Sequence, residues 1–144
     1  MKILIFMLAS SLALTAYGQT NSNNPLKKIN SKTKNAMDLT KISNEKVQKA
    51  IDALQQNDKK AWYSYFTANA TFTDDGRTLD FKGFFENAFA KKEKFLEISK
   101  IEDNGKHITG KFYAGQWGTF NVFFKFHQDA DGKFSRLDIG QAGK

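Results

Sequence analysis

Apolar residues between positions 43 and 94 recur with the spacing of α-helices. Val47, Ala50, Ile51 and Leu54 lie three or four residues apart, which places them on one face of a helix. We expect Ser43 to cap this helix at its N-terminus. Two further helices are predicted on the same grounds. Their inward-facing residues are Ala61, Trp62, Tyr65 and Phe66, after a cap at Asp58, and then Phe84, Phe85, Ala88 and Phe89.

Beyond residue 94 the pattern changes to that of β-strands. Strands are predicted at residues 95–102, 107–114 and 120–127, and a final strand carries Leu137 and Ile139 on one face. Turn residues separate them, and a short β-prone segment at residues 70–73 precedes an Asp-Gly turn. This order predicts an α+β fold, with three N-terminal helices packed on a curved, mostly antiparallel sheet.

The beginning of the chain has the features of a signal peptide. Lys2 supplies a positive charge, an apolar run continues to Leu14, and Ala16 and Gly18 are the small residues that a signal peptidase reads. We therefore expect residues 1–18 to be removed before Gln19, and the mature protein to be secreted or periplasmic. The apolar run is too short and too interrupted to serve as a stable membrane anchor.

Positive charge is concentrated in the segment that follows. Residues 19–43 hold five lysines against one aspartate and few apolar residues, which predicts a flexible basic tail before a domain at residues 44–144. That domain carries 16 basic and 14 acidic residues, in a chain whose formal net charge is +7. A nucleic-acid-binding domain would show the reverse distribution, so no nucleic-acid partner is expected.

Several stretches of the domain follow a recognisable order. They are residues 53–58 (a helix end, a break and an aspartate), 66–76 (an aromatic residue, then A-T-apolar-x-D), 81–85 (a helix start with Gly83) and 131–137 (a final hairpin). In these stretches the chain resembles the nuclear transport factor 2-like superfamily, in its SnoaL-like and ketosteroid-isomerase-like branches. The resemblance implies a cone-shaped domain that encloses an apolar pocket, and a homodimer formed through the outer sheet face.

Asp74 is the candidate catalytic residue. The resemblance places it where the isomerase branch keeps its general base, which removes a proton next to a carbonyl group. That branch also needs a tyrosine and a protonated acid as donors to the enolate oxygen, and the matching positions here are Ala50 and Val122. Neither side chain can donate. A role for Asp74 in the neighbouring Asp75-Gly76 turn is the alternative explanation.

Eighteen aromatic residues between positions 44 and 144 favour an apolar ligand site. The same rings would equally well fill the space and leave a solid core. The candidate ligand-binding residues lie on the apolar faces of the predicted helices and strands: Trp62, Tyr65, Phe66, Phe85, Phe89, Phe112, Val122, Phe124 and Leu137.

Sequence motifs for cofactors are missing from the chain. It contains no phosphate-binding or dinucleotide-binding glycine motif, and His107 and His127 lack the spacing of metal ligands, so we expect no cofactor and no metal. The function expected from the sequence is the binding of a small apolar or amphipathic molecule without catalysis. The alternatives are a cofactor-free isomerase, lyase or cyclase that uses Asp74 as its base, and a protein-interaction module.

Overall fold

The computed structural model describes residues 37–143, so the predicted signal peptide and residues 19–36 of the predicted tail lie outside the described residues. Three α-helices, three short 3-10 turns and six strands follow one another in that range. In chain order they are η1 (Leu39–Lys41), α1 (Glu45–Gln55), α2 (Lys59–Ser64), β1 (Phe66–Asp74), β2 (Arg77–Leu79), α3 (Phe81–Ala90), β3 (Lys94–Glu102), η2 (Asp103–Gly105), β4 (His107–Tyr113), η3 (Gly115–Trp117), β5 (Thr119–Gln128) and β6 (Phe134–Gln141).

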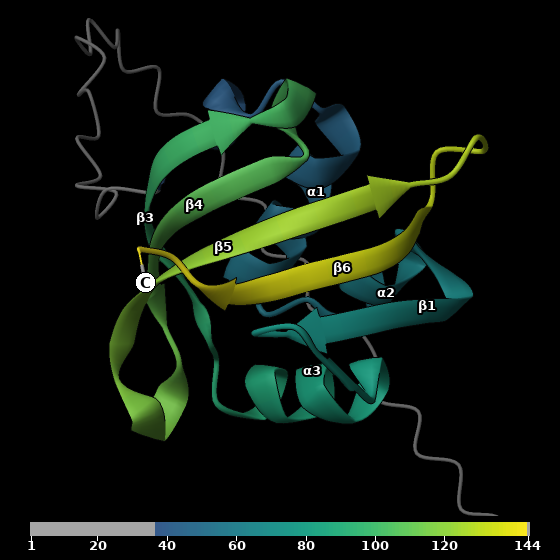
Figure 1. Ribbon diagram of the computed structural model, residues 1–144. Coiled ribbons are helices and arrows are strands. Elements are labelled where there is room, and N and C mark those ends of the chain that lie inside the picture. The colour runs from purple at the N-terminus through teal and green to yellow at the C-terminus, as the bar shows by residue number, and fades with distance from the viewer. Residues whose placement is uncertain (1–36, 144) are drawn as a thin grey trace, which may run out of the picture. The chain divides into compact units, whose positions relative to one another are not determined.

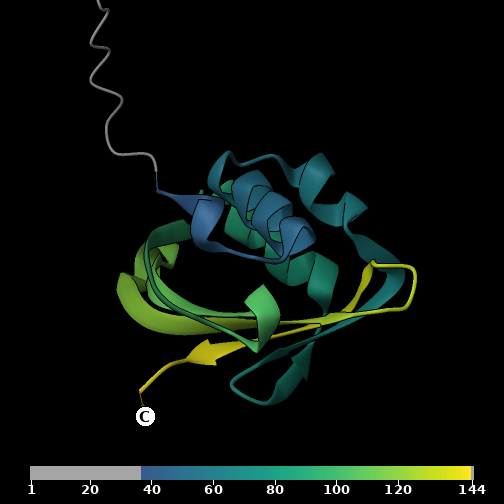
Figure 2. The same cartoon turned by 90° about the horizontal axis from the view of Figure 1, so that it is seen from above.

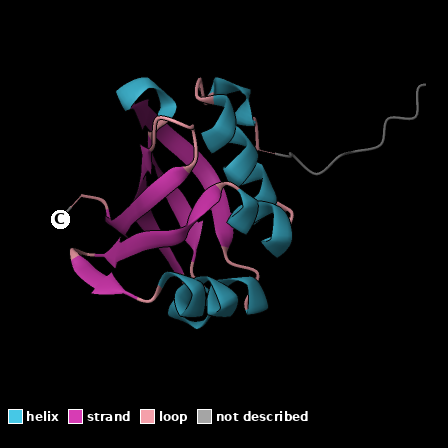
Figure 3. Ribbon diagram, turned by 90° about the vertical axis from the view of Figure 1, so that its right-hand side faces the viewer, coloured by secondary structure: helices cyan, strands magenta, loops and turns pink. Residues whose placement is uncertain are grey.

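The six strands form one sheet in the order β2-β1-β6-β5-β4-β3 (Figure 1). Only β1 and β6 run parallel, and the other neighbouring strands are antiparallel. The sheet curves, and all three helices lie on the same side of it (Figure 2). Helices α1 and α2 are neighbours, whereas α3 crosses one end of the sheet (Figure 3). The predicted α+β fold, three helices on a curved and mostly antiparallel sheet, is confirmed.

Each α-helix begins at a residue whose side chain accepts backbone N–H groups of the first turn. These residues are Asn44, Asp58 and Asp80. A cap of this kind stabilises a helix by about 1 kcal/mol. The predicted cap at Ser43 is therefore wrong by one residue, because the Asn44 side chain reaches the N–H groups of the first turn and also donates to Gln128 at 3.0 Å.

The second helix is shorter than its apolar pattern predicts. It ends at Ser64, Tyr65 follows as its C-cap, and Phe66 is already the first residue of β1. The cause is pairing with a distant strand: the N–H of Phe134 donates to the Tyr65 carbonyl at 2.9 Å, and Phe66 lies opposite Phe134 in the parallel ladder. Long-range pairing overrides the helical spacing here.

Residues 37–42, which belong to the segment predicted as a tail, include side chains that pack on the domain. Asp38 caps the 3-10 turn η1, and Ile42 is only 2% exposed in the core. Met37 and Leu39 pack against the same core. Burying an isoleucine of this kind stabilises the fold by roughly 1.5–3 kcal/mol, which is why the last residues of that segment are ordered. Among the described residues, no helix is long and apolar enough to cross a membrane.

Candidate functional site

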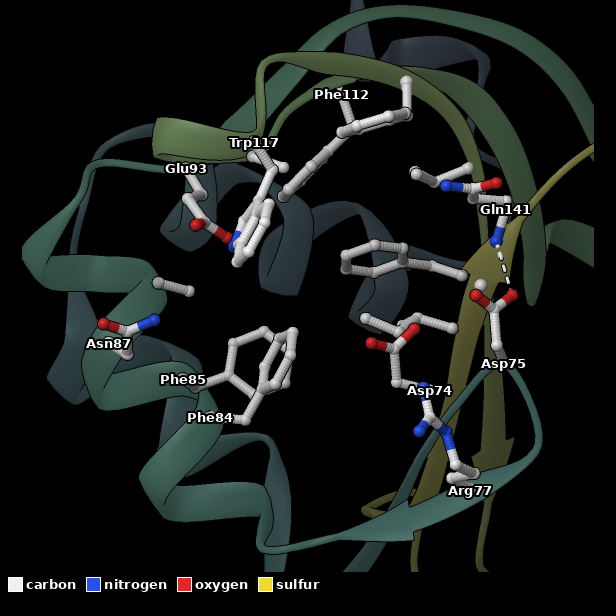
Figure 4. Close-up of a pocket in the computed structure, with 17 residues that line it drawn as sticks. Asp74, Asp75, Arg77, Phe84, Phe85, Asn87, Glu93, Phe112, Trp117 and Gln141 are labelled. Atoms are coloured by element: carbon white, nitrogen blue, oxygen red, sulfur yellow. Dashed lines mark hydrogen bonds between the residues drawn. The ribbon is translucent and has the colours of Figure 1, made fainter.

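A cavity of about 450 Å³ opens between α3, the β4–β5 hairpin and the ends of β1 and β6 (Figure 4). Its apolar wall comes mainly from α3 and from the strands of the concave sheet. The residues of this wall are Phe84, Phe85, Ala88, Phe112, Ala114, Trp117, Phe120, Val122, Phe124 and Ile139. The polar side chains of the lining are fewer: Asp74, Asp75, Arg77, Asn87, Glu93 and Gln141.

Four of the nine predicted ligand-binding residues line this cavity. They are Phe85, Phe112, Val122 and Phe124. The other five do not line it: Tyr65 is half-buried at the end of α2, and Trp62, Phe66, Phe89 and Leu137 are buried in the core.

A cluster of buried aromatic rings around Trp62 fills the part of the domain beneath α2 and leaves the cavity in another part. Trp62 is 0% exposed, and its ring centroid lies 4.9 Å from Phe66 and 4.8 Å from Phe85. Phe126 and Phe134 close the same cluster at 4.8 Å from one another. Aromatic packing therefore fills the space beneath α2, and the cavity remains where α3 faces the strands.

Asp74 lies at the end of β1 and lines the cavity. The turn after it is made by the next two residues, because Asp75 and Gly76 both have positive φ, at 47° and 80°, as a two-residue hairpin loop requires. Asp75 also accepts the Gln141 N–H at 3.0 Å. Arg77 is the cross-strand partner of Asp74, and Figure 4 shows the two side chains next to each other. Asp74 therefore faces the cavity at the end of β1, while Asp75 and Gly76 form the turn.

Glu93 is a cavity residue that the sequence analysis missed. It is only 7% exposed and lines the cavity from the segment between α3 and β3. Its carboxyl group makes no hydrogen bond or salt bridge within residues 37–143. Burial raises the pKa of the Glu93 carboxyl, and the nearby Lys91 ammonium offsets only part of that rise. A signal was present in the sequence: Glu93 follows Phe85 and Phe89 at intervals of four residues, and it precedes the buried Phe95 by two.

The backbone after α3 is folded so that Glu93 turns inward. The N–H of Lys92 donates to Phe89 at 3.1 Å and the N–H of Glu93 donates to Ala88 at 3.0 Å, which closes the helix. Lys92 has a φ of 54° at a position where glycine is the usual residue. Beyond it, the Gln55 side chain exchanges hydrogen bonds of 2.8 and 2.9 Å with the Phe95 backbone. Both sides of Glu93 are therefore fixed.

The η3 turn of the β4–β5 hairpin lies against Glu93. A Cβ atom at Gly115 would stand 3.1 Å from Oε1 of Glu93 and 2.8 Å from Cδ of Lys91. Gly115 also has a φ of 58°, so a glycine is required on both counts. The same turn carries Trp117, which is 70% exposed although its ring lines the cavity. An aromatic ring and a buried carboxyl group thus meet at one side of the cavity.

A polar cluster occupies the opposite, outer face of the sheet. The Asp138 carboxylate accepts hydrogen bonds from Thr73 at 2.7 Å and from Arg136 at 2.8 Å, and lies 2.7 Å from Nε2 of His127. Burial alone would raise the pKa of Asp138, but these hydrogen bonds outweigh burial and hold the pKa below its ordinary value. Within residues 37–143, no group of three or more His, Asp or Glu side chains is arranged to hold a metal ion.

Comparisons with known proteins support the fold. No family model matches the chain, and no curated protein matches it in sequence. Among solved structures, a nuclear transport factor 2-like protein of unknown function from Cytophaga hutchinsonii superimposes with a TM-score of 0.54 and 16% identity, over 74% of this chain and 91% of that one. A candidate polyketide cyclase from Sinorhizobium meliloti gives a TM-score of 0.53 and 20% identity, over 65% of this chain and 92% of that one.

A third solved structure of similar fold is that of a protein with a bound ligand. The Orange Carotenoid Protein of Anabaena, binding canthaxanthin, gives a TM-score of 0.51 and 20% identity. The match covers 68% of this chain but only 35% of that protein, so this chain corresponds to a part of it. Together with the observed sheet order and helix placement, these structures show that the chain has the nuclear transport factor 2-like fold, as the resemblance in its sequence predicted.

Proposed function

We propose that this chain is an exported domain that binds one small, largely apolar molecule in the cavity between α3 and the concave sheet, without chemical conversion. The observation that carries the proposal is the cavity itself. Its volume of about 450 Å³ lies within the range of small-molecule sites, and most of its wall is aromatic or aliphatic. The signal-peptide features of residues 1–18 support export.

The cavity volume limits the size of the ligand. At about 30 Å³ for each water molecule in the liquid, 450 Å³ corresponds to roughly fifteen waters, and so to a ligand of about that many non-hydrogen atoms. At about 0.3 kcal/mol for each such atom, an unoptimised probe would bind with a Kd in the range of roughly 0.1–1 mM. The binding of canthaxanthin by a protein of similar fold supports a largely apolar occupant.

Narrowing the cavity tests this function. Ala114 lies in the cavity wall, so Ala114→Phe should reduce the affinity for an apolar probe such as octanol by roughly tenfold or more. Ala68→Phe makes the same change at an exposed position of β1 and serves as the control, with an expected change of less than about twofold. Titration calorimetry measures both. If the two variants bind octanol equally well, the ligand does not occupy this cavity.

A second function is favoured by one observation, that Asp74 and Glu93 line the same cavity. Figure 4 shows their carboxyl groups on different sides of it. In a cofactor-free isomerase, lyase or cyclase, Asp74 would act as the base, and a protonated Glu93 would be the oxyanion donor that Ala50 and Val122 cannot provide. Epoxides, ketones and enol-forming lactones are the substrates to screen.

Asp74→Asn separates the two functions. In a binding protein, ligand affinity should stay within roughly tenfold of the unmodified protein, because one partly solvated polar contact is lost. In an enzyme, loss of the base should lower turnover by about two to four orders of magnitude. Turnover that collapses in Asp74→Asn would overturn the binding function, and equal binding without turnover would exclude the enzyme.

A further inference from the structure

The geometry of the cavity points to the charge of its ligand: we propose that the occupant is an amphipathic cation, an ammonium group on an apolar body, whose charged end lies between the Glu93 carboxylate and the ring of Trp117. This inference rests on the proposed binding function and specifies the class of molecule that is bound. It assigns Glu93 as the residue that selects the cation.

Glu93 lacks a hydrogen-bond or salt-bridge partner in the part of the chain that the structure describes. Its side chain is 7% exposed, yet it caps no helix, bonds no backbone group and forms no salt bridge within residues 37–143. Leaving a mostly buried carboxylate without a protein partner lowers stability by roughly 1–3 kcal/mol, although its oxygens are not fully shut off from the space of the cavity. A ligand group that pairs with the carboxylate would offset this penalty.

The lining of the cavity holds more acidic than basic side chains. The chain carries a formal charge of +7, but the cavity is lined by three carboxyl groups (Asp74, Asp75 and Glu93) and one cation, Arg77. Arg77 is the cross-strand partner of Asp74 and stands away from Glu93 (Figure 4). An anionic ligand would meet an unfavourable potential here, whereas a cation would meet a favourable one.

The charged groups that face Glu93 or its cavity come from two places, the end of α3 and the β1–β2 hairpin. Lys91, at the end of α3, lies close enough to lower the pKa of the carboxyl group, but its effect is smaller than that of burial. Asp74, Asp75 and Arg77 face the cavity from the β1–β2 hairpin, and the cavity residues of β4, β5 and β6 carry no titratable side chain. These groups do not neutralise the negative charge of the Glu93 carboxylate, so a cationic group of the ligand would supply the missing positive charge.

An aromatic surface lies beside Glu93 in the cavity (Figure 4). Trp117 is 70% exposed at the cavity, and Phe112 lies with it on the same side (Figure 4). The face of an aromatic ring attracts an ammonium group by about 0.5–2 kcal/mol, depending on how far water is excluded. The carboxylate would pair with the ammonium group of the ligand, and the aromatic rings beside it would contact both the ammonium group and the apolar chain.

Three probes with the same apolar chain test the proposal: octyltrimethylammonium, octanol and octanoate, titrated calorimetrically at neutral pH below their aggregation limits. The cation should bind roughly tenfold or more tightly than octanol, and octanoate should bind most weakly. The cation has a permanent charge, so its affinity should rise as the pH rises through the pKa of Glu93, with release of a proton on binding.

Glu93→Gln tests the assigned residue and keeps the shape of the side chain. It should lower the affinity for octyltrimethylammonium by roughly tenfold and abolish the pH dependence, while leaving the affinity for octanol within about twofold. Retained octanol binding also demonstrates that the variant is folded. Glu97→Gln removes the charge of an exposed carboxylate on β3, outside the cavity, and should leave all three affinities unchanged.

Each outcome has a distinct meaning. If none of the probes binds, the proposed binding function itself fails. If octanol or octanoate binds as tightly as the cation, the binding function stands and the cationic ligand is wrong. If the cation is preferred but Glu93→Gln has no larger effect than Glu97→Gln, the preference arises from the protein surface, and the assignment to Glu93 is overturned.

Discussion

Glu93→Met is expected to stabilise the protein, because it removes a buried carboxyl group that has no hydrogen-bond partner within residues 37–143. Methionine has a similar length and suits an apolar wall. Removing an unpaired buried polar group should raise the free energy of unfolding by about 1–3 kcal/mol. For a domain of this size, each kcal/mol corresponds to roughly 4–8 °C, so Tm should rise by about 4–24 °C.

The gain should depend on pH in a definite direction. Burial raises the pKa of Glu93 in the folded protein above its ordinary value of 4.5, which applies to the unfolded chain. Below that value, both states hold the proton. As the pH rises through the interval between the two pKa values, the unfolded chain releases its proton first, so the folded state loses stability. Methionine does not titrate, and the advantage of Glu93→Met should therefore be larger at about pH 7 than at about pH 4.

Thermal and chemical denaturation at both pH values measure this effect. Glu97→Met is the matched control, because its carboxylate is exposed on β3, and a change within about 0.5 kcal/mol is expected. If Glu93→Met is no more stable than the unmodified protein at neutral pH, the Glu93 carboxyl is already held by favourable contacts. The case for a ligand that pairs with it would then be refuted.

Three further predictions concern the tail, the outer face and assembly. A chain that starts at Ser43 should lose roughly 1.5–3 kcal/mol relative to one that starts at Met37, measured by urea denaturation, because it lacks the buried Ile42. The pKa of Asp138 is lower in the folded protein than its ordinary value of 3.8, so ionised Asp138 stabilises the fold above pH 3.8. This stabilisation should disappear as the pH falls through the lowered pKa, and Asp138→Asn should remove it in acid titrations followed by circular dichroism. Light scattering should show a dimer, and Phe123→Lys on the outer sheet face should shift it toward monomer.

The elements with a regular apolar pattern were predictable from the sequence. The face of α1 formed by Val47, Ala50, Ile51 and Leu54 is buried as expected, and so are Leu137 and Ile139 of β6. These cases succeed because local spacing and burial agree. For Phe66 the local pattern gives the wrong element. Its spacing from Trp62 fits a helix, but Phe66 belongs to β1, because it pairs with Phe134 of the parallel strand β6, more than sixty residues away in the chain.

The residues that line the cavity were predictable only in part, since an apolar face does not reveal whether it meets another side chain or an empty space. Phe85 and Phe89 lie four residues apart on the inner side of α3, yet Phe85 lines the cavity and Phe89 does not. Both rings pack against Trp62, with centroid distances of 4.8 Å for Phe85 and 6.3 Å for Phe89, so contact with the core does not distinguish the ring that also reaches the cavity. Such complementarity between distant elements leaves no trace in the spacing of residues.

Glu93 shows most clearly why the composition of a segment is a poor guide to its burial. Its neighbours in the chain are lysines, and a run of charged residues ordinarily forms a solvated turn. Glu93, however, follows the left-handed residue that closes α3, and its N–H bonds to the Ala88 carbonyl, so the chain turns its side chain toward the cavity between the buried Phe89 and Phe95. The backbone on both sides is fixed by hydrogen bonds, and this geometry, which composition does not reveal, decides where the side chain points. A charged residue that the backbone directs into a cavity is therefore a candidate for function, and in this domain it is the residue whose substitution is most informative.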